Sequence, residues 1–319
     1  MFSAQSAAVA REVLLHGAIA SRHTLLRAGY TPQAIDRARA EKLIVTIRRG
    51  VYASYGADID QRRAVRMGAR IGCVSALRRF GVWGGLDPRL HVHVEAGSNG
   101  LHIAEVSQLG RDRQVARSDK DFYAEGGPPR VHWQNAGRTM ALNSGRNDSD
   151  WLAPPLLALR QAVLCQDEEH SIASIDSAIR KRYIRGNDLD VLFQSLPQRL
   201  QRLRAELDPL ADSGTESIFR VRLRRLGHKV EPQRDVPGSS KFDALIDDVV
   251  AVDLDSRRWH GDEAQQEWDY DKTLLSFLWG RPALRIRPHH LFEKWPETLQ
   301  VIERTIEDAR DLRRYRGLG

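Results

Sequence analysis

The chain has 319 residues and a formal net charge of +7, with 49 Lys and Arg against 42 Asp and Glu. This length predicts two or three domains, and the positive charge favours a polyanionic partner, of which nucleic acid is the first candidate. The sequence shows no run of about 18 apolar residues and no secretory signal pattern. We therefore expect no membrane span and a cytoplasmic, nucleoid-associated protein.

The sequence contains two cysteines, Cys73 and Cys165. Two cysteines do not make a disulfide framework, and the sequence has neither a CxxC pair nor a Cys/His spacing of the zinc type. We therefore expect both to be thiols of the core.

Three helices and a hairpin are predicted at the start of the chain. Helices are expected over residues 4–17 and 21–29, and a third begins at Thr31, whose side chain can cap it. The segment IVTIRRGVYAS then alternates apolar and polar residues, which predicts a β-hairpin. This order is typical of a winged helix-turn-helix, which we assign to residues 1–80. A three-helix bundle with a basic surface hairpin is the alternative.

Four residues of this segment are candidates for contact with double-stranded DNA. Gln33 and Arg37 lie four residues apart on the polar side of the third helix, which enters the major groove in a winged helix. Arg48 and Arg49 precede the turn of the hairpin and would reach the adjacent phosphates.

Residues 81–205 are predicted to be a mixed, mainly helical connecting region. RLHVHVEA and RVHWQ read as strands, and the segment between them is rich in Gly and Ser. Helices are expected again from about residue 154 to residue 208.

The last region, residues 206–319, predicts a compact α/β unit. Its order is a helix (SGTESIFRVRLRRLG), three strands (HKVEPQRDV, KFDALID, VVAVDLD), a helix (QQEWDYDKTLLSFLW) and a strand (ALRIRP). The fold class that we predict for the whole chain is multidomain α+β.

Three carboxylates are expected to meet on the middle strands of this unit. Alternation places Asp253 and Asp255 on one face of their strand, and a hairpin turn through residues 247–248 would bring Asp243 to the same side. Like charges this close raise one another's pKa, and a divalent cation relieves the conflict. Oxygen ligands favour Mg²⁺ or Mn²⁺, the metals of phosphodiester hydrolysis. A solvated strand edge is the alternative interpretation.

Two further residues are candidates for the same site. Glu216, in the first turn of the preceding helix, can lean over it, although a capping box with Ser213 explains the same pattern. His260 follows Trp259 and can transfer a proton or orient water, whereas a structural histidine is the alternative.

The motifs SGTESIFRVRLRRLG, PQRDVPG, FDALID, VAVDLDSRRWH and ALRI, over about residues 211–305, resemble one known domain. It is the C-terminal domain of a family of actinobacterial proteins similar to very-short-patch-repair (Vsr) endonucleases and to the restriction-endonuclease-like PD-(D/E)xK group. The segment SRHTLLRAGYTPQAIDRARAEKLIVTIRRGVYAS resembles the winged-helix domain of AbiEi-type antitoxins, which bind DNA.

The resemblance implies a catalytic set at matched positions. These are Asp243 as the first acid, Asp253 as the acid of the next strand, Asp255 as the aspartate of the usual EVDG motif, His260 as the histidine after the tryptophan, and Glu216 as the helix glutamate.

The chain departs from the family pattern at three positions. Asp253 stands where glutamate is common, Ser256 replaces a glycine, and Thr273 stands where the helix usually has an aspartate. The lysine of a strict PD-(D/E)xK signature is also missing, because Asp255 occupies its place.

These patterns predict a DNA-binding protein whose C-terminal domain is a metal-dependent endodeoxyribonuclease using Mg²⁺ or Mn²⁺. The alternative is a non-catalytic transcriptional regulator of AbiEi antitoxin type with a degenerate nuclease fold. A protein that recognises damaged or mismatched DNA is a third. A homodimer and a complex with a cognate toxin or another protein are further candidate assemblies.

Overall fold

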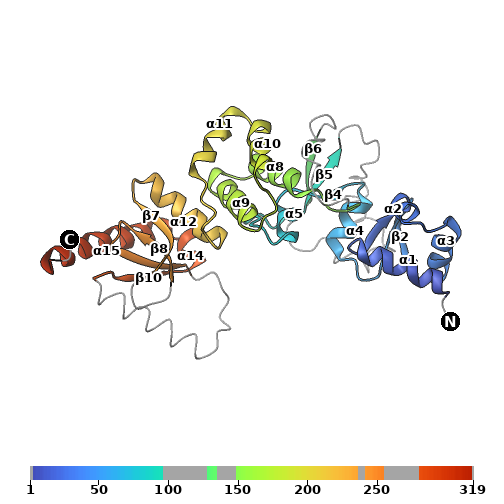
Figure 1. The fold of residues 1–319 in the computed structure, drawn as a ribbon, viewed down its shortest axis with the longest axis horizontal. Coiled ribbons are helices and arrows are strands. Elements are labelled where there is room, and N and C mark those ends of the chain that lie inside the picture. The colour runs from blue at the N-terminus through green and yellow to red at the C-terminus, as the bar shows by residue number, and fades with distance from the viewer. Residues whose placement is uncertain (1–2, 96–127, 135–148, 236–240, 255–279, 318–319) are drawn as a thin grey trace, which may run out of the picture. The chain divides into compact units, whose positions relative to one another are not determined.

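The computed structural model describes residues 3–95, 128–134, 149–235, 241–254 and 280–317. The chain forms two compact units of mixed α+β structure (Figure 1). Unit 1 contains residues 1–165 and 186–196, and unit 2 contains residues 166–185 and 197–319. In the described part of the chain, no helix is long and apolar enough to cross a membrane.

Unit 1 begins with three helices and a small antiparallel sheet. The elements are α1 (Ala4–Leu15), β1 (Ile19–Ser21), α2 (Arg22–Arg27), α3 (Pro32–Ala40), β2 (Val45–Arg48) and β3 (Val51–Ala53). The strand order is β1-β3-β2. The three predicted helices and the hairpin are therefore present, whereas the three-residue strand β1 is too short for its pattern to predict.

Helix capping and a shared core hold these elements together. The hydroxyl groups of Ser3, Ser21 and Thr31 each accept a hydrogen bond from a backbone N–H in the first turn of the helix that follows. The core consists of buried residues from all three helices, from β1 and β3 and from the residue before β2: Val9, Val13, Ala20, Leu25, Ala34, Ile35, Ala38, Ile44 and Tyr52. Burial of this apolar face leaves the polar side of α3 exposed.

The rest of unit 1 is built around a second sheet. Its elements are α4 (Ile59–Arg66), β4 (Arg70–Ile71), α5 (Cys73–Arg79), β5 (His91–Glu95), β6 (Arg130–Gln134), α8 (Pro155–Cys165) and α10 (Asn187–Ser195). The order is β4-β5-β6, with β6 parallel to β5. Helix α5 packs against both α8 and β5, so the first predicted strand of this region lies beside a buried helix and the second pairs with that strand.

Unit 2 contains a four-stranded sheet with the order β10-β9-β8-β7. Its elements are α9 (Glu168–Arg180), α11 (Gln198–Gln201), the 3₁₀ helix η2 (Arg202–Glu206), α12 (Gly214–Arg225), β7 (Val230–Asp235), β8 (Lys241–Ile246), β9 (Val250–Leu254), β10 (Ala283–Ile286), α14 (Pro288–Phe292) and α15 (Trp295–Tyr315). Strands β7, β8 and β9 pair antiparallel, and β10 pairs parallel to β9. The helix predicted over QQEWDYDKTLLSFLW lies outside the described residues.

The turn between β8 and β9 lies where the sequence predicts it. Asp247 and Asp248 form it with φ angles of +50° and +62°. Positive φ at both central residues is typical of the two-residue turns that match the twist of a hairpin. This turn fixes the register of β8 against β9, and therefore the face on which each acidic residue lies.

A fully buried ion pair joins α12 to α9. Asp176 accepts hydrogen bonds from Arg220 (2.8 Å), from the Ser217 hydroxyl (2.9 Å) and from the Asp208 N–H (2.9 Å). Arg220 also donates to the Glu206 carbonyl (2.8 Å). Burial raises the pKa of Asp176, and the Arg220 charge opposes that rise. Each of the two charges is stabilised by the other, because neither side chain reaches solvent.

Asp176→Ala is expected to lower the stability of α9 and α12 by about 3–5 kcal/mol, because it leaves the Arg220 charge buried without its partner. Hydrogen exchange of amides in the two helices measures this loss. Arg202→Ala, which removes an exposed pair with Glu168, is the control and should cost less than about 1 kcal/mol. Equal effects of the two substitutions would contradict the assignment.

Candidate functional site

The β8–β9 hairpin brings Asp243 opposite Asp253. Ala244 pairs with Val252 in the antiparallel register, so the preceding residue of β8 lies across from the following residue of β9. Residues directly opposite each other share a face of the sheet. Asp243 Oδ2 also accepts a hydrogen bond from the Leu254 N–H at 2.7 Å. Two half-buried carboxylates therefore lie side by side near the end of the hairpin.

Arg285 extends this face to a third strand. It pairs with Asp253 in the parallel register of β9 and β10, so the two side chains lie on the same face. Sequence reasoning did not select Arg285, although the alternation in ALRI would place it opposite the buried Ile286. The acidic face, which we define as Asp243, Asp253 and Arg285, thus carries a cation of its own.

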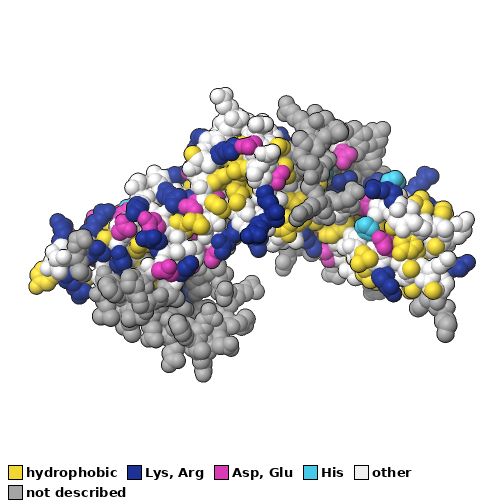
Figure 2. All heavy atoms as spheres, in the orientation of Figure 1, with side chains coloured by type: hydrophobic (Ala, Val, Ile, Leu, Met, Phe, Trp, Pro, Cys, Tyr) yellow, Lys and Arg dark blue, Asp and Glu magenta, His cyan; other side chains and the backbone are white. Residues whose placement is uncertain are grey.

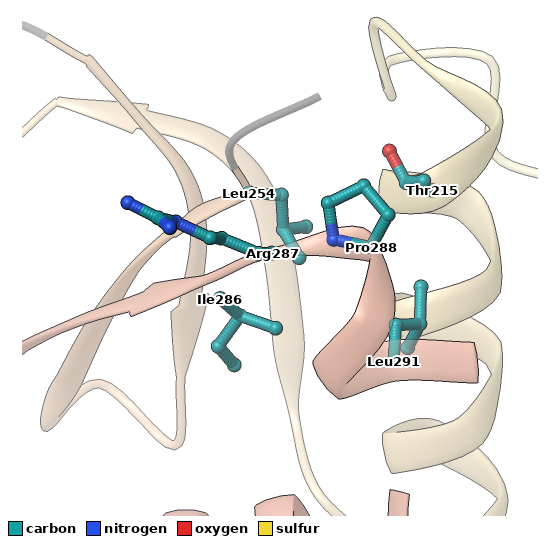
Figure 3. A pocket seen from close by; sticks show the side chains of 6 residues that line it. All are labelled: Thr215, Leu254, Ile286, Arg287, Pro288 and Leu291. Atoms are coloured by element: carbon teal, nitrogen blue, oxygen red, sulfur yellow. The ribbon is translucent and has the colours of Figure 1, made fainter. Parts of the chain in front are cut away.

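The opposite side of these strand ends is closed by packing. Leu254 and Ile286 line a narrow recess together with Thr215 of α12 and with Arg287, Pro288 and Leu291 (Figure 3). The recess is too narrow to hold a water molecule. Because neighbouring strand residues alternate, Asp253 and Arg285 lie on the face away from it.

Glu216 lies buried at the start of α12. Its carboxylate accepts hydrogen bonds from the Asp212 N–H (2.7 Å) and from Gln233 Nε2 (3.0 Å), while its own N–H donates to Ser213 Oγ (3.2 Å). Gln233 has a φ of +52° and lies opposite Asp243 in the continuous β7–β8 register. Burial, and then the charge of Asp243, raise the pKa of Glu216 to about 7. Glu216 is therefore part of a helix cap, and its pKa also depends on the charge of Asp243 in the acidic face.

The remaining predicted residues of this site, Asp255 and His260, lie outside the described residues, as do Ser256 and Thr273. Their roles stay predictions.

The four residues predicted to contact DNA are all exposed. Gln33 and Arg37 lie on the same side of α3, and Arg48 and Arg49 lie at the turn between β2 and β3. Arg22 and Arg39, in contrast, both pair with Asp36. Among the described residues, none forms an ion pair with Arg37, Arg48 or Arg49. These three guanidinium groups are therefore suited to an external anion.

Many of the basic residues in unit 2 form ion pairs with acidic residues. Figure 2 shows Lys and Arg side chains on both units, with Asp and Glu beside many of them toward the C-terminal end. Arg225, for example, pairs with both Glu168 and Glu206.

A second cluster, which we call the Cys/His cluster, was missed by sequence reasoning. It consists of Cys73, His91, His132 and Cys165, whose potential ligand atoms all lie within 4.8 Å of one another. His91 Nδ1 lies 3.1 Å from His132 Nε2, and Cys165 Sγ lies 3.7 Å and 4.0 Å from these two atoms. The expectation of two core thiols is right for the buried Cys73 and wrong for the partly exposed Cys165.

The two thiols of this cluster differ in acidity. Burial raises the pKa of Cys73. A hydrogen bond from the Cys73 thiol, followed by contacts with His132 and His91, lowers the pKa of Cys165. The cluster therefore favours one thiolate facing two imidazole rings.

The sequence matches no protein-family model and none of the curated proteins with which it was compared. The resemblance to AbiEi-type antitoxins and Vsr-like nucleases stays a prediction.

Glu216→Gln is expected to change how stability depends on pH in the absence of divalent metal. A buried carboxyl whose pKa is raised from 4.5 to about 7 destabilises the fold as the pH rises through this range. The wild type should lose about 2.5 kcal/mol between pH 5 and pH 8 from this group, and the variant should not. Denaturant unfolding at both pH values in EDTA measures the difference. The exposed Glu297→Gln is the control, and parallel curves for wild type and Glu216→Gln would exclude the effect.

Proposed function

We propose that this protein binds double-stranded DNA through α3 and the β2–β3 turn, and that it cleaves DNA with Mg²⁺ or Mn²⁺ at the acidic face. The observation that carries the proposal is the pairing of Asp243 with Asp253 on one face of the sheet, beside the buried Glu216. Two adjacent carboxylates are a typical arrangement for an oxygen-ligated divalent ion.

The N-terminal part supports the DNA-binding half of the proposal. Three helices followed by a hairpin, with the strand order β1-β3-β2, is the arrangement of a winged helix-turn-helix. In that interpretation α3 enters the major groove, where Gln33 and Arg37 meet base edges, and Arg48 and Arg49 contact phosphates. Cytoplasmic, nucleoid-associated localisation belongs to the same proposal.

The residues of the acidic face have separate proposed roles in cleavage. Asp243 and Asp253 would hold the metal, with Asp255 as a further ligand, and the ion would activate water and neutralise the phosphate. The Leu254 N–H keeps Asp243 in place, and Glu216 holds the first turn of α12 beside it. Arg285 is suited to contact the substrate phosphate, and His260 is proposed for proton transfer.

One observation favours the alternative of a DNA-binding regulator without cleavage. Arg285 lies next to Asp253 across β9 and β10, and a guanidinium group can neutralise carboxylates without metal. A homodimer and a toxin partner fit this alternative as well as they fit the nuclease.

The double variant Arg48→Ala, Arg49→Ala is expected to weaken duplex binding on all DNA sequences. It should also lower the slope of log affinity against log salt by about two, since each phosphate contact contributes about one. Fluorescence anisotropy at several salt concentrations measures both. Arg304→Ala with Arg314→Ala, on the exposed side of α15, is the charge-matched control. Loss of affinity in the control alone would move the DNA interface to another surface.

Asp243→Ala and Asp253→Asn are expected to abolish metal-dependent nicking of supercoiled plasmid while leaving duplex affinity nearly unchanged. The reason is that rate depends on the metal ligands, whereas affinity depends on arginines elsewhere. The assay compares wild type and variants with Mg²⁺, Mn²⁺ and EDTA, on mismatched and methylated substrates as well. If wild type binds duplex and stays as inert as the variants under all conditions, the regulator alternative replaces the nuclease.

A further inference from the structure

We propose that the Cys/His cluster of unit 1 binds one Zn²⁺ ion as a closed structural site, with Cys73, His91, His132 and Cys165 as its four ligands. This site is separate from the acidic face: its ligands come from α5, β5, β6 and α8, all within unit 1.

The spacing of the ligand atoms matches a tetrahedral zinc centre. Zinc–nitrogen and zinc–sulfur bonds of about 2.05 and 2.3 Å at tetrahedral angles place two nitrogens about 3.3 Å apart, and a sulfur and a nitrogen about 3.6 Å apart. The corresponding distances are 3.1 Å between His91 and His132, and 3.7 and 4.0 Å from Cys165 Sγ to them. Small shifts of side chains would complete the coordination.

The donor set selects the metal. Two sulfurs and two imidazole nitrogens form a tetrahedral Cys₂His₂ set, which suits Zn²⁺ and not the oxygen-seeking Mg²⁺ or Mn²⁺. A disulfide between the two cysteines would leave unexplained why two histidines of neighbouring strands direct ring nitrogens at the same point. With four protein ligands there is no open coordination position, so the site is structural and not catalytic.

A carboxylate supports one of the ligands from behind. His91 faces the cluster through Nδ1, and its Nε2 lies 3.2 Å from Asp87 Oδ2. Asp87 is itself held by Arg89 at 2.6 Å. A carboxylate on the outer nitrogen of a metal-binding histidine fixes its orientation and increases its basicity.

The backbone conformation at Cys73 sets the direction of the Cys73 side chain. Cys73 has a φ of +48°, which is rare for a residue with a side chain. Its N–H donates to Gln161 Oε1 at 3.0 Å, and Gln161 Nε2 lies 2.9 Å from His93 Nδ1. A Cβ at Gly72 would lie 2.8 Å from Gln161 Oε1 and 2.9 Å from His93 N, so only glycine fits there.

The ion would join parts of unit 1 that the chain connects only distantly. Strand β6 pairs with β5 alone among the described strands, and 20 residues separate the end of β6 from the start of α8. Zinc bound to His132 and Cys165 fixes β6 and the end of α8 to α5 and β5. Its removal should loosen this sheet, and α8 with it, before it affects unit 2.

The test uses the full chain expressed with zinc in the medium. Elemental analysis should give one Zn²⁺ per chain, and Co²⁺ exchange should give the visible bands of tetrahedral cobalt with a thiolate charge-transfer band. Cys165→Ser and His132→Asn should lower zinc affinity at least 100-fold, and Asp87→Asn by 10- to 100-fold. His16→Asn, a histidine outside the cluster, and Asp243→Ala on the acidic face should keep one Zn²⁺ per chain.

A ligand-conserving variant separates metal binding from packing. His132→Cys should keep zinc, because three cysteines and one histidine also make a tetrahedral site, whereas His132→Asn should not. The proposal is overturned if the wild type contains no zinc and takes up no Co²⁺, or if the cobalt protein lacks the thiolate band. It is also overturned if Cys73 and Cys165 are recovered as a disulfide, or if His132→Cys and His132→Asn lose zinc equally.

Discussion

The buried pair of Asp176 and Arg220 fixes the position of α12, and the arrangement of unit 2 depends on it. Three groups of the helix and its surroundings converge on one carboxylate, which leaves little freedom for rotation or sliding of α12 against α9. An apolar pair of similar size would often be as stable. We infer that the charged pair sets the register of the helix, because only one register satisfies both charges. The side chains of Thr215 and Glu216 reach the strand ends as a consequence.

Charge on the acidic face is balanced among groups from five elements. Asp243 raises the pKa of Glu216, Gln233 donates to Glu216, and Arg285 lies beside Asp253. Near neutral pH, Glu216 is thus close to its midpoint and changes its charge in response to a small change in local potential. A divalent ion between Asp243 and Asp253 would favour the ionised form of Glu216. Binding of the ion at the acidic face and loss of the proton from Glu216 are therefore linked.

Most of the helices and strands could be predicted from local sequence patterns. Contacts between residues that are distant in the sequence could not. Thr31 marks the start of α3, and Asp247 and Asp248 mark the β8–β9 turn, because caps and tight turns depend on a few neighbouring residues. The Cys/His cluster has no such signature, since its ligands are separated by 41 residues between His91 and His132 and by 33 between His132 and Cys165. Their convergence follows from the parallel pairing of β5 with β6, and sequence periodicity does not specify that pairing. Arg285 was missed for a related reason, because only the register of β10 against β9 places it beside Asp253.

The Cys/His cluster is also relevant to how the candidate DNA-binding arginines of unit 1 are held in position. The segment that leads into α8 holds the N-terminal helices directly: Asp150 Oδ2 accepts from the Ser21 N–H (2.7 Å) and the Thr24 hydroxyl (2.6 Å), and Trp151 Nε1 donates to the His16 carbonyl (2.9 Å). The segment before α8 therefore lies beside the start of α2, and α8 itself ends at Cys165, a proposed zinc ligand. Phosphate contacts from a helix and a hairpin turn act together only if the spacing between them is fixed. A metal that immobilises α8 would stabilise that spacing through Asp150 and Trp151, so the proposed zinc site would have a structural role in the proposed DNA binding without any contact with DNA.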